Sequence, residues 1–121
     1  MTFHFPGNAT TSTLLACASA ANTAAATGTG VDMLLYEGLA LVIQNHGTST
    51  GTLDGKLQDS ADNSLFADVP GLAFTQSTTT ADTKALSFQT KGVRRYVRYL
   101  GTVGTGPQVV GVTLSAVRKS F

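Results

Sequence analysis

The chain has 121 residues, of which 42% are hydrophobic and only 12% are charged. This length predicts one domain over residues 1–121, large enough to bury about two-thirds of its unfolded surface without a disulfide or metal. The net charge is +1. A charge this small lacks the field with which nucleic-acid-binding proteins attract their ligand, so we expect no nucleic-acid partner.

The charges are distributed unevenly along the chain. All seven acidic residues and one base, Lys56, precede Lys84, whereas the other seven Lys and Arg residues occur from Lys84 onward. Two interpretations are open. Neighbouring strands mix the charges in space, or the molecule is electrically polar and docks on a charged partner.

Cys17 is the only cysteine, so an internal disulfide is excluded. We expect Cys17 to be a small buried apolar residue. The sequence L-L-A-C that ends there imitates a lipoprotein cleavage box. A signal peptide needs a basic region before its apolar stretch, whereas the first basic residue of this chain is Lys56. No apolar stretch reaches the length of a membrane span. We therefore expect no membrane partner.

Residues 1–10 are predicted to form an extended N-terminal arm. The sequence M-T-F-H-F-P-G-N places Phe3 and Phe5 on alternate positions before a Pro-Gly break. Such a segment needs something to hold it in place. It either packs as an edge strand on its own domain or grips a neighbouring subunit.

The next part of the chain alternates short apolar runs with turn residues, which is typical of β-strands. A strand is predicted over 11–18 and a loop over 20–30. Further strands are predicted over 31–36, 39–45, 53–59, 65–69 and 84–90. Leu39, Leu41 and Ile43 share one face of their strand. Pro70-Gly71 is predicted to end the strand over 65–69.

Residues 91–121 form two runs rich in β-branched and aromatic residues, separated by G-T-G-P. This pattern predicts a hairpin that is the central strand pair of the fold. In the second run a period of two places Val110, Val112, Leu114 and Ala116 toward the core. In the first run Val93, Val97, Tyr99 and Val103 share a face. With about eight strands and no amphipathic helix, the chain is predicted to be all-β, an antiparallel β-sandwich or jelly roll.

Three segments carry a resemblance to a known group of proteins. They are T-G-T-G-V-D-M-L-L-Y-E-G at 27–38, the run from L-D-G-K at 53 to V-P-G at 71, and Y-V-R-Y-L-G-T-V-G-T-G-P at 96–107. The chain resembles small β-sandwich, jelly-roll-like capsid cement or decoration proteins of tailed bacteriophages and prophages. In place of the double-acid turn usual in that group, it has Ala61 before Asp62, with Asn63 where glycine often sits.

We find no sequence motif for catalysis or metal binding. P-loop, G-x-S-x-G, H-E-x-x-H and paired C-x-x-C patterns are absent. His46 falls in a turn region and is expected to be solvated. Calcium requires oxygen ligands, and four carboxylates are candidates: Asp54, Asp59, Asp62 and Asp68. Their spacing lacks the EF-hand pattern, so we expect them to form turns and to be solvated. We expect no cofactor, no metal and no enzymatic activity.

Arg94, Arg95 and Arg98 form a basic–aromatic cluster with Tyr96 and Tyr99. In such a cluster the rings can stack on nucleic-acid bases and the arginines can neutralise phosphates, but the small net charge disfavours this interpretation. It can also pair with carboxylates and rings across strands. Because Arg and Tyr are enriched at interface centres, it can face a protein partner as well. For this last case we predict that the interface residues are Phe3, Phe5, Arg94, Tyr96 and Arg98.

The resemblance implies a virion structural protein on the capsid exterior, synthesised in the host cytoplasm. Its expected partner is the major capsid protein, whose subunits it bridges to stabilise the shell. A homo-oligomer, either a dimer or a trimer, is also expected. The alternative is a β-sandwich module that binds carbohydrate for host recognition. A sugar platform normally exposes Trp or Tyr, whereas this chain has no Trp and places its tyrosines by the arginines.

Overall fold

The computed structural model describes residues 9–20, 25–49, 51–104 and 108–118; for 9–20, 25, 108 and 118 it describes the backbone only. The described residues form nine strands and two 3-10 helices. In chain order these are β1 (Ala9–Ala20), β2 (Ala25–Thr27), β3 (Val31–Asp32), η1 (Met33–Leu35), β4 (Tyr36–His46), β5 (Leu53–Ser60), β6 (Ala67–Ala73), β7 (Asp82–Gln89), η2 (Thr90–Gly92), β8 (Tyr96–Val103) and β9 (Gln108–Arg118). No helix in this part of the chain is long and apolar enough to span a membrane.

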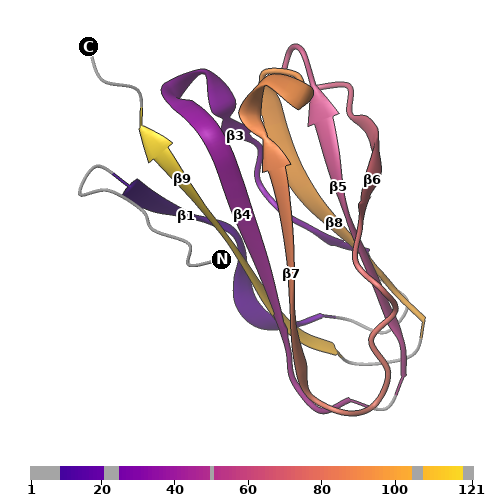
Figure 1. Cartoon of the computed structure of the whole chain (residues 1–121). Helices are drawn as coiled ribbons and strands as arrows, with labels where there is room; N and C mark the ends of the chain where they lie inside the picture. Colours follow the sequence, from indigo (N-terminus) through magenta and orange to yellow (C-terminus); the bar gives the residue numbers. More distant parts are fainter. Residues whose placement is uncertain (1–8, 21–24, 50, 105–107, 119–121) are drawn as a thin grey trace.

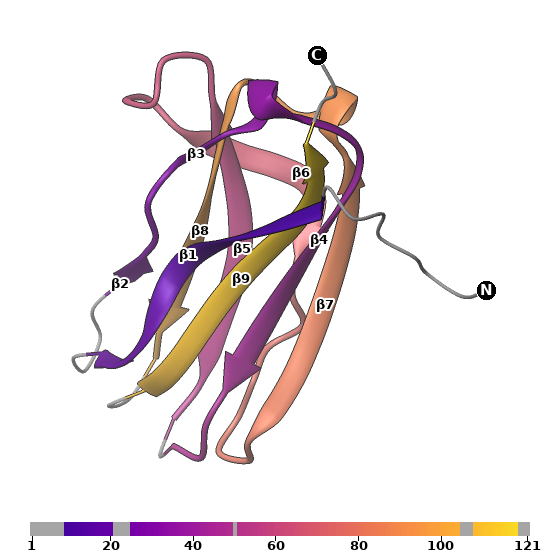
Figure 2. The same ribbon diagram turned by 90° about the vertical axis from the view of Figure 1, so that its left-hand side faces the viewer.

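The strands form two antiparallel sheets that pack face to face (Figure 1). One sheet has the order β1-β9-β4-β7, and the other has the order β2-β8-β5-β6, with β3 also paired to β8. Figure 2 looks onto the outer face of the first sheet. Because β2 and β3 occupy one strand position, the eight positions have the strand order of a jelly roll. The predicted all-β sandwich is confirmed.

The core lies between the sheets and follows the predicted period of two. The inward positions of β9 are 0–1% exposed and are those predicted from the sequence: Val110, Val112, Leu114 and Ala116. On β8 the predicted inward residues Val97, Tyr99 and Val103 are 0–3% exposed. Cys17 lies in β1, where only the backbone is described, so its burial stays a prediction.

The predicted central hairpin is wrong. β8 pairs with β2, β3 and β5, whereas β9 pairs with β1 and β4 in the opposite sheet. The chain therefore crosses between the sheets after Val103 instead of turning back within one sheet. A short Gly/Pro-rich connection is compatible with both arrangements, because the local pattern reports a reversal of direction and not which strand becomes the partner.

Strand β4 turns its larger apolar side chains outward. Ala40, Val42 and Gln44 are 0% exposed in the core. Leu41 and Ile43, on the opposite face, are half-buried. This partition follows from the Tyr99 ring, which occupies the space opposite β4 and places its hydroxyl next to Gln44.

The predicted arm over 1–10 is too long, because β1 begins at Ala9. Three further segments differ clearly from their predicted boundaries. β2 occupies part of the predicted loop over 20–30, and the predicted strand over 31–36 becomes β3 followed by η1, whose first turn Asp32 caps through the Leu34 amide. β6 continues through Pro70 and Gly71, where the register against β5 shifts and Gly71 has a φ of 80°. An edge strand with an irregularity tolerates proline because no ladder hydrogen bond is required there.

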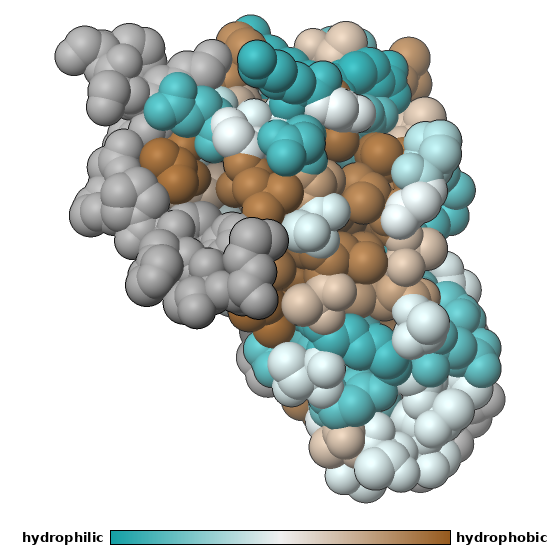
Figure 3. Space-filling view, viewed as in Figure 1, coloured by the Kyte–Doolittle hydropathy of each residue, from teal (hydrophilic) through white to brown (hydrophobic). Residues whose placement is uncertain are grey.

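The four sheet edges differ in regularity. β2 and β3 are three and two residues long, β6 carries Pro70, and the pairing of β1 with β9 has two register shifts. By contrast, β7 pairs with β4 in an unbroken register over its whole length. β7 and β6 border the side of the sandwich that faces the viewer in Figure 1, and apolar residues gather over the middle of this side (Figure 3).

Candidate interaction site

The arginine cluster at the start of β8 is held by carboxylates from distant strands. Arg94 donates to Asp59 through its backbone amide (3.0 Å), through Nε (2.9 Å) and through a terminal nitrogen to the carbonyl oxygen (2.7 Å). Arg95 donates to Asp32 at 3.2 and 2.9 Å. The Arg95 guanidinium holds the pKa of Asp32 below its usual value. Both arginines are about half exposed and paired within the chain.

Arg98 differs from its neighbours because its contacts are an amide and a ring. Its Nε donates to Gln58 Oε1 at 3.0 Å, and its guanidinium lies 4.0 Å from the centroid of the Phe66 ring. Among the described residues it forms no ion pair. Tyr96 lies under Arg95, 5.0 Å from the ring centroid to the guanidinium carbon. The structure thus places Tyr96 and Arg98 on the outer face of β8 and Arg94 two residues before this strand, and the predicted interface role of all three stays a prediction.

Phe3 and Phe5, the other predicted interface residues, lie outside the described residues. They therefore cannot be placed relative to the arginine cluster. The backbone of β1 does establish where this segment joins the fold. Ala9 pairs with Val117 of β9 at the edge of the four-stranded sheet.

The unequal distribution of charge along the sequence is compensated in the described part of the fold. Four ion pairs join Lys or Arg to Asp, and in three of them the base is Lys84 or a later residue. Strands from the acidic first part and the basic last part are hydrogen-bonded neighbours, as β5 and β8 are. This arrangement agrees with the interpretation that the strands mix the charges in space.

Of the carboxylates considered for calcium, Asp62 lies in a turn as expected, whereas the expectation of a turn is wrong for the other three, which lie in β5 and β6: Asp54, Asp59 and Asp68. All four have hydrogen-bond partners within the chain. Asp62 accepts from the amides of Ser64 and Leu65 at 2.9 and 3.1 Å, and these backbone bonds lower its pKa. The next residue, Asn63, has a φ of 60°, a conformation that asparagine tolerates better than most residues. Asp68 accepts from Lys56 and Gln58, each at 2.8 Å. Within the described chain, no group of three or more His, Cys, Asp or Glu is arranged to hold a metal ion.

A buried polar network, which the sequence did not predict, connects the two sheets. The Tyr99 hydroxyl on β8 donates to Gln44 Oε1 on β4 at 2.6 Å, and the Gln44 amide donates to Ser77 Oγ at 3.4 Å. All three residues are 0% exposed. Burial raises the pKa of Tyr99, so its hydroxyl remains protonated as a donor. The network supplies the hydrogen bonds that buried polar groups require.

The network continues from Ser77 to an ion pair at the start of β7. Ser77 donates to Asp82 at 3.2 Å and accepts from Lys84 Nζ at 2.8 Å, and Lys84 pairs with Asp82 at 2.6 Å. The hydrogen bond from Lys84 is the main cause that lowers the pKa of Asp82. A serine beside a lysine invites comparison with a catalytic pair. However, Ser77 is fully buried, so a substrate does not reach its hydroxyl in this conformation, and the expected lack of enzymatic activity stays a prediction.

We expect Lys84→Met to lower the free energy of unfolding at pH 7 by about 1–2 kcal/mol, because a charged hydrogen bond to a partly buried carboxylate is lost. The lowered pKa means that Asp82 stabilises the fold above the usual carboxyl pKa of about 3.9, and that this contribution is lost as the pH falls through the lowered value. The difference from wild type should therefore shrink in acid. Urea unfolding at stepwise lower pH measures it. Lys91→Met, which removes an exposed lysine, is the control, and a difference independent of pH contradicts the assignment.

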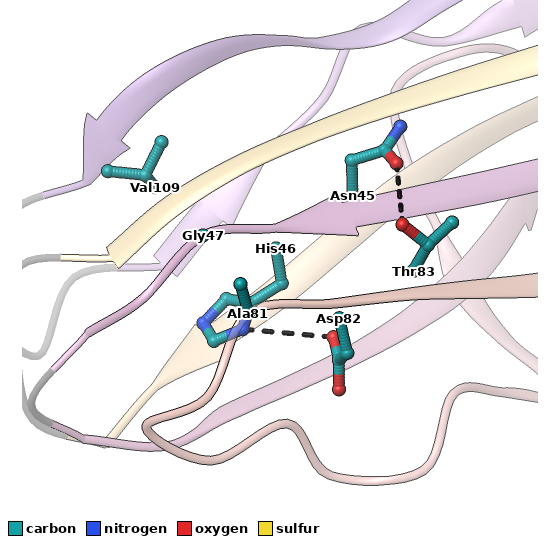
Figure 4. Close-up of a pocket in the computed structure, with 7 residues that line it drawn as sticks. All are labelled: Asn45, His46, Gly47, Ala81, Asp82, Thr83 and Val109. Carbon is teal, nitrogen blue, oxygen red and sulfur yellow. Dashed lines mark hydrogen bonds and ion pairs between the residues drawn. The ribbon is translucent and has the colours of Figure 1, made fainter.

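A cavity of about 380 Å³ lies at the end of the sandwich near His46 (Figure 4). It is lined by Asn45, His46, Gly47, Ala81, Asp82, Thr83 and Val109. The expectation that His46 is solvated is wrong. His46 is 3% exposed because β4 extends to this residue, and its Nδ1 lies 3.8 Å from Asp82. The lining residues include no Tyr, Phe or Trp on which a sugar ring could stack.

No protein-family model matches the sequence, and no curated protein does. Solved structures do share the fold. XepA, an exported protein of PBSX, is 15% identical with a TM-score of 0.68 over 93% of this chain and 38% of XepA. The prophage SPBc2 protein YomS is 16% identical with a TM-score of 0.62 over 97% of this chain and 98% of YomS. A chain from Bacillus endospore appendages, which form disulfide-linked pili, is 13% identical with a TM-score of 0.54 over 99% of this chain and all of that one.

These comparisons establish that the chain shares its all-β fold with phage and prophage proteins. The likeness to YomS spans nearly the whole of both chains, whereas this chain spans less than two-fifths of XepA. The resemblance noted in the sequence is therefore supported at the level of the fold.

Proposed function

We propose that the chain is a structural protein of a phage particle that binds the outside of the head as a capsid cement protein. The observation that carries the proposal is the jelly-roll fold shared end to end with the prophage protein YomS. Ser77 is buried, and the described residues assemble no metal site. A protein that binds the assembled shell better than separate subunits stabilises the shell through linkage.

In this proposal the arginine end of β8 faces the major capsid protein. Arg94 and Arg95 already pair with Asp59 and Asp32, so they contribute shape and hydrogen bonds more than net charge. Arg98 is the cation whose charge remains available to an acidic partner. Tyr96 is half-buried beside it and offers a rigid aromatic contact. Many copies on one shell make a modest individual interface sufficient.

The proposal is tested first on the particle. Heads purified from the phage that encodes the chain should contain it in a fixed ratio to the major capsid protein. Heads made without the chain should burst at a lower temperature, and adding the purified protein back should restore the original value. Heads of unchanged stability, or mature heads that lack the chain, contradict a cement role.

The second test concerns the arginine end. We expect Arg98→Ala to weaken binding to heads roughly tenfold at low salt, since the loss of an interface arginine is worth about 1–2 kcal/mol. The loss should be smaller at high salt, where exposed charges are screened. Arg94→Ala should have less effect on the salt dependence because Asp59 already neutralises Arg94. Lys91→Ala, an exposed lysine on η2, is the matched control. Undiminished binding of the double Arg94→Ala, Arg98→Ala variant removes this cluster from the interface.

The alternative is a carbohydrate-binding module for host recognition, and its site would be the cavity near His46. Asn45 and Asp82 carry the amide and carboxylate groups that hydrogen-bond sugar hydroxyls. Asn45 already accepts from Thr83 at 3.0 Å, and Asp82 already pairs with Lys84. Glycan-array binding that Asn45→Ala abolishes, together with a location on tails or fibres, would favour this alternative over capsid cement.

A further inference from the structure

The free edge of β7 is suited to accept another strand. β7 is the last strand of its sheet, so the backbone groups on its outer side have no strand partner among the described residues. Its second part, Ala85–Gln89, carries no charge and no proline. Natural proteins normally protect such an edge with a short strand, a proline, a bulge or a charge. Here the other three edges carry such features and this stretch of β7 does not.

The side chains beside this edge are apolar and incompletely covered. Leu86 and Leu72 are half-buried against the core, and Ala85 and Ala73 are exposed. The view in Figure 3 shows apolar surface over this region. A cavity of about 250 Å³ lies between the two edge strands, lined by Ala73, Phe74, Thr75, Lys84, Ala85 and Leu86. It is smaller than typical ligand sites, which begin near 300 Å³, and its size favours a single side chain as occupant.

We propose that this edge binds residues 1–8 of a second copy of the chain, which add to β7 as an antiparallel or parallel strand. Phe3 and Phe5 alternate with Thr2 and His4, so both rings project from one face of an extended segment. Leu86 and Phe88 have the same spacing on the inward face of β7. Paired across neighbouring strands, side chains on one face lie about 5 Å apart, within contact. One phenylalanine ring then occupies the cavity beside Leu86.

The position of β1 favours a second copy over the chain's own segment. Residue 9 begins β1, and β9 and β4 separate β1 from β7. A strand added outside β7 lies four strand spacings from β1, about 19 Å at about 4.8 Å each, so the crossing uses roughly six residues at about 3.3 Å each. Residues 3–8 would be consumed, so both Phe3 and Phe5 would lie at the crossing and could not lie along β7. A neighbouring copy meets no such restriction.

This inference concerns self-association and does not rest on the capsid proposal. If two copies exchange residues 1–8 with each other, they form a closed dimer. If each copy gives this segment to the next copy around a ring, a larger closed assembly results. Main-chain hydrogen bonds provide the affinity, and the two phenylalanine rings provide the register. The test uses the purified full-length chain without heads, so its result is separate from that of the head-binding experiments.

Sedimentation over a concentration series tests association, with the double variant Phe3→Ser, Phe5→Ser beside the control Thr2→Ala, His4→Ser from the opposite face of the same segment. We expect the wild type and the control to associate. We expect the Phe variant to have a dissociation constant raised at least roughly 100-fold, since two buried rings are lost. A monomeric wild type at about millimolar concentration, or a Phe variant that associates like wild type, overturns the proposal.

Amide hydrogen exchange then locates the contact. Ala85–Gln89 should be more protected in the associated wild type than in the monomeric Phe variant, which keeps the fold. Adding the peptide M-T-F-H-F-P-G-N to that variant should restore the protection, and the same peptide with both Phe replaced by Ser should not. Protection gained on the outer face of β4 instead, or unchanged exchange along β7, contradicts the assignment of the edge.

Discussion

Replacing Gly55 by alanine is expected to lower the free energy of unfolding by about 2–3 kcal/mol, although only one methyl group is added. A Cβ at this position would lie 2.5 Å from the Tyr99 hydroxyl and would also overlap Gln44 Oε1. These two atoms are hydrogen-bonded to each other at 2.6 Å in the core. Neither side chain can move away without breaking that bond, so the clash has to be relieved by the backbone of β5.

Urea unfolding monitored by circular dichroism measures this effect, with Gly92→Ala as the matched control. Gly92 lies in η2, and a Cβ there would meet nothing within 4 Å. We expect the control to leave stability nearly unchanged. Equal stabilities for both variants would show that the core beneath Tyr99 yields more readily than the contacts indicate.

Replacing Tyr99 by alanine is expected to lower the free energy of unfolding by about 3–5 kcal/mol, the usual cost of removing a buried aromatic ring. Among the described residues, Tyr99 has the largest fully buried side chain. The centroid of its ring lies 6.2 Å from the centroid of the Phe74 ring. Tyr99→Phe isolates the hydroxyl. It should cost about 1–3 kcal/mol, because Gln44 Oε1 loses its donor inside the core.

The control for Tyr99 is Tyr96→Ala on the same strand. Tyr96 lies on the outer face, half-buried under Arg95. We expect its removal to cost less than half of what Tyr99→Ala costs. If Tyr99→Phe unfolds at the same urea concentration as wild type, the hydrogen bond to Gln44 contributes no net stability, and the network serves only to satisfy groups that would otherwise be unpaired.

The strands of this fold were largely predictable because their core faces alternate. The inward residues of β9, from Val110 to Ala116, were identified from a period of two, which reports directly on one buried face. The turn at Asp62 and Asn63 was predictable for a similar reason. Its side-chain-to-backbone bonds and positive φ are properties of the residues themselves.

The partners of the strands were not predictable from the same signal. The pattern of β8 and β9 was interpreted as a hairpin, but each strand pairs with others far away in sequence. Gln44 shows the same limit at the level of one residue. An amide between Ile43 and Asn45 suggests a solvated position, and only the Tyr99 hydroxyl, supplied by the opposite sheet, makes its burial favourable.

The candidate site was predictable in composition and not in electrostatics. The sequence places Arg94 and Arg98 four residues apart, and in the structure their partners Asp59 and Gln58 are consecutive residues of β5. The sequence could not indicate that Asp59 would neutralise Arg94 while Arg98 lies over the Phe66 ring. That difference depends on the register between β5 and β8, where Gln58 pairs with Arg98.

The pairing of β1 with β9 determines when this molecule can finish folding. Ala9, near the beginning of the chain, has its backbone partner at Val117. During synthesis on the ribosome β1 therefore waits for its partner strand until Val117 has emerged. Such non-local topologies fold slowly and expose unpaired strands in the meantime. A product that ends before β9 lacks the strand that joins β1 to β4, so its strands stay unpaired and open to proteolysis.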